Sequence, residues 1–385
     1  MSQSTLSTAK STLSTLYGPL PPSSPQTWTT PPSSGGHKGR YLWTDAFGVL
    51  TLITLHRELN SPSSPSQDRD QDNTYLALAS ALITTVHDIL GSTRDGKSRL
   101  PRSSERKPLS GGLRIGKIDA DGPDGDGQYH HYLTLWMFAL NRMSLATNES
   151  RYNEMAVELA KGIHPRFVFN REIENKGGDD HIRMVWKMDT GLEKVLVGSQ
   201  GNLDPVDGFV VFRLLQGTAA YFNPGGSQRG VLQDEIEDYA RIMKRRGAHS
   251  VSADPLDLGM TMWTVQWCLG EDWASGLAER CFERVYDLFE VKEYLSRSTS
   301  HRLAFREFGT ALGIRCLAEQ GSEKDKAVDL KVYADRILES WKGNMQDSIE
   351  DGTPEDLKPI TRVMYAAALI PGAFRRGYLG REPKI

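Results

Sequence analysis

The sequence predicts an all-α fold in which helical hairpins close into a ring. Segments that are apolar on every side alternate with amphipathic segments, as expected for inner helices buried all round and outer helices with one face in water. Five of the six inner segments carry an acidic residue near their start, and these acids lie 81, 81, 50 and 50 residues apart. The spacing indicates a repeat of about 50 residues with two helices per unit, lengthened twice by insertions. A superhelical array of helix pairs would also fit this alternation, but a ring places the acids around the opening of one central cavity.

Each inner helix is predicted from an apolar run that follows a capping residue, an acid or a glycine. The inner helices cover residues 41–59, 128–146, 209–221, 261–269, 311–319 and 359–370. The outer helices cover residues 75–91, 152–164, 231–246, 273–289 and 326–341. Their apolar residues recur at helical spacing, which indicates one buried face.

Two insertions interrupt the repeat. Residues 61–73 are polar and predict a loop. Residues 165–200 contain short runs rich in valine and aromatic residues, FVFN, RMVWKM and KVLVGS. These runs predict a small β-hairpin and an approaching strand.

The N-terminal segment, residues 1–39, is predicted to be a flexible arm rich in Ser, Thr and Pro. Residues 2–17 have a weak helical pattern, and residues 18–39 are dominated by Pro, Ser and Gly, which is typical of a loop or a disordered arm. Residues 40–385 then form one domain.

The composition is that of an ordinary globular protein. The 385 residues are 38% hydrophobic and 25% charged, and the net charge of -3 favours neither a nucleic-acid nor an anionic-membrane partner. No stretch approaches the roughly 20 apolar residues needed to span a bilayer. The three cysteines are widely spaced, which indicates buried thiols in a reducing compartment rather than disulfides or a zinc site. We therefore expect a cytoplasmic protein.

The stretch Gly111–Met143 concentrates the chemistry of the chain. A strand-like piece carries Arg114 and Lys117, a glycine-rich loop carries four aspartates, and two adjacent histidines open an apolar helix. The loop departs from the EF-hand spacing, so neither a metal nor another cofactor is predicted. Asp126, about one turn before His130, is expected to pair with it.

Six inner helices, acids at their starts and aromatic-rich loops resemble the six-hairpin glycosidase-like (α/α)6 toroids. The resemblance covers about residues 40–380 and implies a carbohydrate-active enzyme, first of all a glycoside hydrolase. Such an enzyme uses two carboxylates, one as acid and one as base or nucleophile. Asp207 and Glu307 are the first candidates, followed by Asp126 and Asp45. Helix capping alone would also account for any single one of these acids.

Further residues are predicted to bind the substrate, a small saccharide or glycoconjugate, charged or uncharged. They supply aromatic surface, cations for an anionic group, or polar groups beside the inner helices: Trp43, Arg114, Lys117, Tyr129, His130, His131, Asp257 and Arg306. Arg114 and Lys117 could equally pair with the aspartates downstream. Asp204 and Asp254, each before a proline, are predicted to be helix caps. Trp136, Trp263 and Trp267 are predicted to be core.

Three other functions stay open. A sugar epimerase or isomerase would use His130 or His131 to remove a proton next to a carbonyl. A uronate lyase would use Tyr129 or a histidine as base and Arg114 to neutralise the uronate. From another class, the ring could bind a small molecule without catalysis or serve non-sugar chemistry. The sequence does not indicate an oligomeric state.

Overall fold

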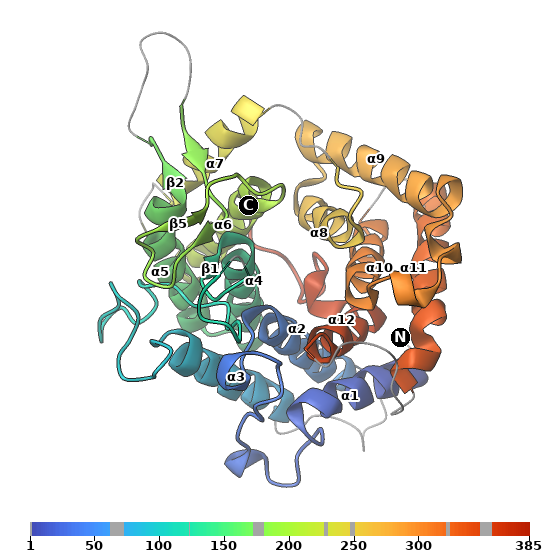
Figure 1. Ribbon diagram of the computed structural model, residues 1–385, viewed down its shortest axis with the longest axis horizontal. Helices are drawn as coiled ribbons and strands as arrows, with labels where there is room; N and C mark the ends of the chain where they lie inside the picture. The colour runs from blue at the N-terminus through green and yellow to red at the C-terminus, as the bar shows by residue number, and fades with distance from the viewer. Residues whose placement is uncertain are drawn as a thin grey trace. The chain divides into compact units, whose positions relative to one another are not determined.

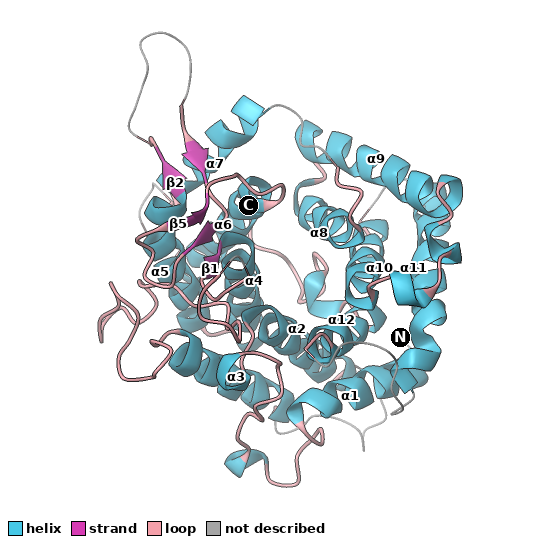
Figure 2. Cartoon of the chain, viewed as in Figure 1, coloured by secondary structure: helices cyan, strands magenta, loops and turns pink. Residues whose placement is uncertain are grey.

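The computed structural model describes residues 2–61, 73–122, 124–171, 181–226, 230–246, 251–320, 324–346 and 356–385. Most of these residues are helical (Figures 1 and 2). The helices of the N-terminal half are α1 (Gln3–Tyr17), α2 (Leu42–Leu59), α3 (Thr74–Leu90), α4 (His130–Thr147), α5 (Ser150–Phe167) and α6 (Asp204–Phe222). The rest are α7 (Gln233–Arg246), α8 (Pro255–Val265), α9 (Asp272–Tyr286), α10 (Ala304–Ala318), α11 (Lys324–Gln346) and α12 (Lys358–Leu369).

Five short strands interrupt the helices at β1 (Gln128–Tyr129), β2 (Val168–Phe169), β3 (Arg183–Met184), β4 (Lys187–Met188) and β5 (Val195–Val197). One sheet has the order β1-β4-β5 and the other pairs β2 with β3, all antiparallel. The predicted hairpin within residues 165–200 is therefore confirmed. Because β4 also pairs with β1, the excursion fixes the backbone just before α4.

The chain divides into two compact units, each made of separate segments. Unit 1 comprises Met1–Gly35, Leu50–Leu78 and Ser250–Gly380. Unit 2 comprises Gly36–Val49, Ala79–His249 and Arg381–Ile385. The first turns of α2 belong to unit 2 and the remainder to unit 1, so neither unit is a continuous stretch of sequence.

Unit 2 is organised around α4 and α6, which pack against each other and against α5 and α7. Helix α4 is buried along most of its length, including Trp136 and Phe138, whereas α5 buries one face. The predicted alternation of fully buried and amphipathic helices therefore holds within this unit. Burial of Trp136 as core is also confirmed.

Unit 1 repeats the arrangement with α8, α10 and α12 buried and α1, α9 and α11 against them (Figure 1). Helices α8 and α10 cross at glycines: a Cβ on Gly259 would lie 2.1 Å from the carbonyl oxygen of Gly309, and one on Gly313 would lie 2.0 Å from that of Gly259. Only glycine allows two backbones to approach this closely. Trp263 and Trp267 are core, as predicted.

Residues 3–17 form helix α1, which packs on α12. The prediction of a flexible arm does not hold for this helix, because Leu13, Leu16 and Tyr17 lie on one face and are fully buried or nearly so. Ser2 caps the helix by accepting from the backbone N–H of Thr5. The weak helical pattern of residues 2–17 therefore predicted this segment better than its Ser- and Thr-rich composition did.

Three inner helices begin earlier than the apolar pattern predicts. Helix α6 starts at Asp204, α8 at Pro255 and α10 at Ala304, so the acids near their starts lie inside the first turn. Proline is tolerated there because the first helical N–H groups have no partner in the helix. Among the described helices, none is long and apolar enough to cross a membrane.

The three cysteines are buried thiols, as predicted. Burial raises the pKa of both the Cys281 and the Cys316 thiol to about 12. Both therefore stay protonated and unreactive at neutral pH.

Candidate functional site

Unit 2 brings His131 and Asp207 together. His131 lies in the first turn of α4, which β1 fixes by pairing with β4, and Asp207 lies in the first turn of α6. The Nδ1 atom of His131 is 2.5 Å from Oδ2 of Asp207. An ionised carboxylate can only accept, so Nδ1 donates and the imidazole lone pair is on Nε2. The Asp207 side chain is 1% exposed and that of His131 is 18% exposed, so solvent still reaches the imidazole.

Aromatic side chains lie beside His131. We call them the aromatic cluster, and its members are Tyr41, Trp43, Tyr129, Tyr132 and Trp186. The Trp43 ring lies 4.8 Å from the His131 ring, centroid to centroid, and 5.1 Å from that of Tyr132. Tyr129 continues the cluster, 5.1 Å from Tyr132 and 5.0 Å from Trp186. Clustered rings beside a few polar groups are typical of a small-molecule site.

Tyr129 is also covered by a cation. Nζ of Lys187 lies 4.8 Å from the Tyr129 ring centroid and donates to the carbonyl of Gly125 at 3.2 Å. Desolvation lowers the pKa of Lys187, and burial raises the pKa of Tyr129 well above its usual value. Tyr129 therefore remains protonated and serves as a ring surface and a hydroxyl.

His130 forms a separate, buried arrangement. Its Nδ1 lies 3.3 Å from Oδ1 of Asp204, and its Nε2 lies 2.6 Å from the Tyr239 hydroxyl. The expected pairing of His130 with Asp126 is wrong, because Asp126 precedes β1 and lies outside the helix. Asp204 is not the predicted cap either: it lies within α6 and faces His130. The adjacent histidines of α4 therefore lie against two aspartates of α6 that are three residues apart, His130 against Asp204 and His131 against Asp207.

Asp126 holds the glycine-rich loop to the strand-like piece before it. One carboxylate oxygen accepts from Arg94 at 2.7 Å and from Arg114 at 2.5 Å. The other accepts from the backbone N–H groups of Gly116, Lys117 and Gly127. Arg114 therefore pairs with a downstream aspartate, the alternative that the sequence left open. The remaining aspartates of the loop, Asp119, Asp121 and Asp124, are exposed.

Two of the predicted acids form matching ion pairs with an arginine five residues earlier. Arg40 precedes α2 by two residues and lies 3.3 Å from Asp45. Arg302 precedes α10 by two residues and binds both oxygens of Glu307, at 2.7 and 2.5 Å. All four side chains are at most 2% exposed. An arginine five residues before a first-turn acid was a readable signal that the sequence analysis did not use.

The other predicted residues of unit 1 are at the starts of α8 and α10. Asp254 caps α8 through the backbone N–H groups of Leu256 and Asp257, as predicted, and pairs with Arg306. The Asp257 side chain is half-buried. Glu307 also accepts from Trp341 at 2.8 Å.

Of the predicted site residues, the structure therefore gathers Trp43, Tyr129, His131 and Asp207 in one cluster. Arg114, Asp126 and the backbone of Lys117 form another. Tyr41, Tyr132 and Trp186 were missed, because no spacing in the sequence marks which aromatic residues meet. Among the described residues, no three His, Cys, Asp or Glu side chains are arranged to hold a metal ion.

A buried histidine makes the stability of unit 2 depend on pH. His164 bonds Asp238 at 3.0 Å, and Arg171 and Arg241 bind the same carboxylate. Desolvation lowers the pKa of His164 from 6.5 to about 4. The unfolded chain therefore takes up this proton first as pH falls below 6.5, so the native state loses stability between about pH 6.5 and pH 4.

We expect the free energy of unfolding to fall by up to about 3 kcal/mol over this range from His164 alone. Urea unfolding at pH 7.5 and pH 5 measures it. His164→Gln should reduce the pH dependence, whereas His301→Gln, at an exposed position, should leave it as in the wild type. An equal urea midpoint at both pH values in the wild type would contradict the assignment.

Comparison with known proteins supports the fold. No protein-family model and no curated protein sequence matches the chain. Among solved structures, a family 76 glycoside hydrolase from a bovine Bacteroides thetaiotaomicron strain aligns with a TM-score of 0.57 and 13% identity, over 95% of this chain and 77% of that one. A GH76 α-mannanase of Bacteroides thetaiotaomicron aligns with a TM-score of 0.54 and 11% identity, over 95% and 96%. The predicted all-α (α/α)6 toroid fold is therefore confirmed.

Proposed function

We propose that this chain is a carbohydrate-active enzyme that hydrolyses a glycosidic bond, with Asp207 as one of its carboxylates. The observation that carries the proposal is the Asp207–His131 pair beside the aromatic cluster. The flat faces of aromatic rings suit the apolar faces of sugars, and a carboxylate beside them can give or take the proton of the glycosidic oxygen. Similarity in fold to two glycoside hydrolases agrees with this activity.

Asp207 is favoured over the other two nominated acids of unit 2 because of the partners they bind. Asp45 and Asp126 each form an ion pair with a buried arginine, so guanidinium N–H groups occupy their oxygens. A carboxylate occupied in this way has little capacity left to contact a substrate. Asp207 instead meets the imidazole of His131, which is partly exposed to solvent.

The same Asp207–His131 pair also favours a second candidate function, a sugar epimerase or isomerase in which the histidine is the catalytic base. A carboxylate on Nδ1 orients the ring and leaves Nε2 as the nitrogen that can accept a proton. In that reaction, His131 would remove a proton next to a carbonyl, and Asp207 would position it. The uronate lyase is less favoured, because Arg114 is bound to Asp126 and the raised pKa of Tyr129 makes it a poor base.

One experiment separates these functions. The full chain is incubated in D₂O with a panel of saccharides that includes α-mannosides and uronate oligosaccharides, and the products are read by mass spectrometry. Hydrolysis adds one water, whereas epimerisation gives an isomer that carries solvent deuterium at carbon. A product with an unsaturated uronate would indicate the lyase. If no saccharide in the panel is converted by the wild type but some raise its melting temperature, the enzymatic proposal is wrong and a binding function takes its place.

A further inference from the structure

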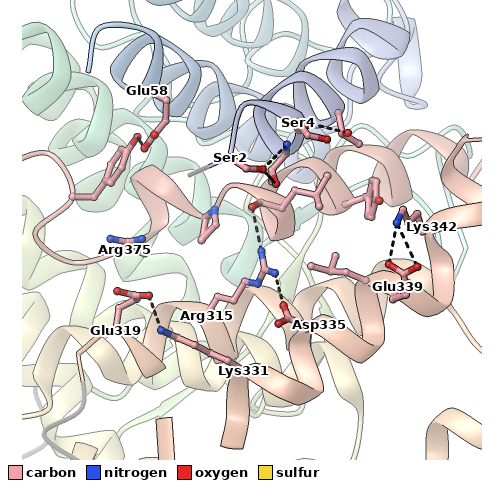
Figure 3. Close-up of a pocket in the computed structure, with 17 residues that line it drawn as sticks. Ser2, Ser4, Glu58, Arg315, Glu319, Lys331, Asp335, Glu339, Lys342 and Arg375 are labelled. Carbon is pink, nitrogen blue, oxygen red and sulfur yellow. Dashed lines mark hydrogen bonds and ion pairs between the residues drawn. The ribbon is translucent and has the colours of Figure 1, made fainter. Parts of the chain in front are cut away.

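Unit 1 contains a large polar cavity that the proposed function does not use. Its volume is about 870 Å³, within the upper range of small-molecule sites. The first turns of α1, one face of α11 and the C-terminal ends of α10 and α12 line it (Figure 3). It lies at the opposite end of α10 from Glu307, so it is separate from that acid.

Most of the charges around the cavity neutralise each other. Arg315 binds Asp335 at 2.7 Å and donates to the carbonyls of Ala368 and Leu369. Two further ion pairs, drawn as dashed lines in Figure 3, are Lys331–Glu319 at 3.0 Å and Lys342–Glu339 at 3.2 Å. These three cations have carboxylate partners and need no ligand.

Arg375 is different. Its Nε is buried and has no hydrogen-bond acceptor among the residues that the structure describes. Its guanidinium lies over the Tyr378 ring, 5.8 Å from the centroid, and forms no ion pair with a carboxylate among the residues that the structure describes. Glu58 accepts from the Tyr378 hydroxyl at 2.8 Å, and Glu319, which interacts with Arg375 electrostatically, is bound by Lys331. Because Arg375 lines the cavity and has no carboxylate partner among the described residues, an anion in the cavity can pair with its guanidinium.

The first turn of α1 adds a second favourable feature for an anion. Ser2, Ser4 and Thr5 line the cavity, and Ser2 and Ser4 are labelled in Figure 3. The N-terminal end of a helix carries partial positive charge and N–H groups without helical partners. The hydroxyls and the carboxylates of the ion pairs can also bond the hydroxyl groups of a ligand.

We propose that this cavity binds a small hydroxylated anion, a sugar or polyol that carries one carboxylate or phosphate. The guanidinium of Arg375 pairs with the anionic group, for which its planar fork is suited. The serine and threonine hydroxyls of α1 bond the hydroxyl groups of the ligand. This site is independent of the proposed hydrolysis at Asp207.

The test is calorimetric titration of the full chain with glucose 6-phosphate, glucuronate, inorganic phosphate and glucose. We expect the two sugar anions to bind and glucose to bind at least about tenfold more weakly, because it lacks the group that meets Arg375. The stronger of glucose 6-phosphate and glucuronate identifies phosphate or carboxylate as the preferred group. Equal affinity for glucose and the sugar anions, or no binding of any of the four, would overturn the proposal.

Two variants locate the binding. Arg375→Gln should weaken binding of the sugar anion about tenfold or more, whereas Arg336→Gln should leave this binding unchanged. Arg336 is an exposed arginine that pairs with Glu290 outside the cavity. Ser4→Asp places a negative charge at the exposed start of α1, where it favours the helix but repels the ligand. Ser4→Asp should weaken binding of the sugar anion with no loss of thermal stability. It therefore tests whether the ligand binds in this cavity even if Arg375→Gln folds poorly. Undiminished binding to Ser4→Asp and to a folded Arg375→Gln would place the ligand elsewhere.

Discussion

Replacing Asp207 with asparagine is expected to lower turnover by about 10²–10⁴-fold on whichever saccharide the chain converts. The amide keeps the shape of the side chain and can still accept from Nδ1 of His131, but it cannot give or take a proton. The fold should therefore survive while the chemistry is lost. Initial rates on the converted saccharide, with the melting temperature measured on the same preparation, check both halves of the expectation.

Asp88→Asn is the matched control for this change. Asp88 lies on α3, also in unit 2, and pairs at the surface with Arg99 at 3.1 Å, so the same chemical change there should leave turnover within about twofold of the wild type. His131→Ala then divides the two candidate functions. A hydrolase should keep part of its activity without the histidine, whereas an epimerase that uses it as the base should incorporate no deuterium. Wild-type turnover by Asp207→Asn would remove Asp207 from the catalytic residues.

Replacing Glu307 with glutamine is expected to lower the free energy of unfolding by about 3–5 kcal/mol. The carboxylate is fully buried and receives three hydrogen bonds, two from Arg302 and one from Trp341. Glutamine fills the same space but leaves the Arg302 guanidinium buried without a counter-charge. Urea unfolding at neutral pH measures the loss.

Glu290→Gln provides the comparison for Glu307. Glu290 pairs with Arg336 at 2.7 Å, but both side chains are more than 40% exposed, so the change should have an effect of at most about 1 kcal/mol. The pair of variants also tests the prediction that Glu307 is catalytic. A Glu307→Gln protein with wild-type stability and no turnover would support the catalytic role and would contradict the structural role of the Arg302–Glu307 pair.

Much of the fold could be predicted from the sequence because it depends on local patterns. The apolar faces of the helices repeat at helical spacing, and glycine, proline and acidic residues mark the first turns of α6, α8 and α10. These patterns also show which helices are buried on all sides. The starts of three helices were placed too late, because first-turn residues are polar and resemble the loops before them.

The candidate site was predicted less completely. Trp43, Tyr129, His131 and Asp207 were nominated from separate inner-helix starts, and the structure places them in one cluster. The sequence paired His130 with the wrong aspartate. It also treated the acids at the helix starts as equivalent. The arginines five residues before Asp45 and Glu307 could have separated these two from Asp207, which has asparagine at that position.

By itself, the sequence determined the alternation of buried and amphipathic helices and the placing of an acid in the first turn of most buried ones. Both follow from interactions within a few residues, namely helical periodicity and the helix dipole. Only the tertiary structure decided what each acid meets: two arginines for Asp126, an imidazole for Asp207. The behaviour of a carboxylate depends on the charges and donors within a few ångströms, and Arg94 and His131 reach those distances through folding, from 32 and 76 residues away.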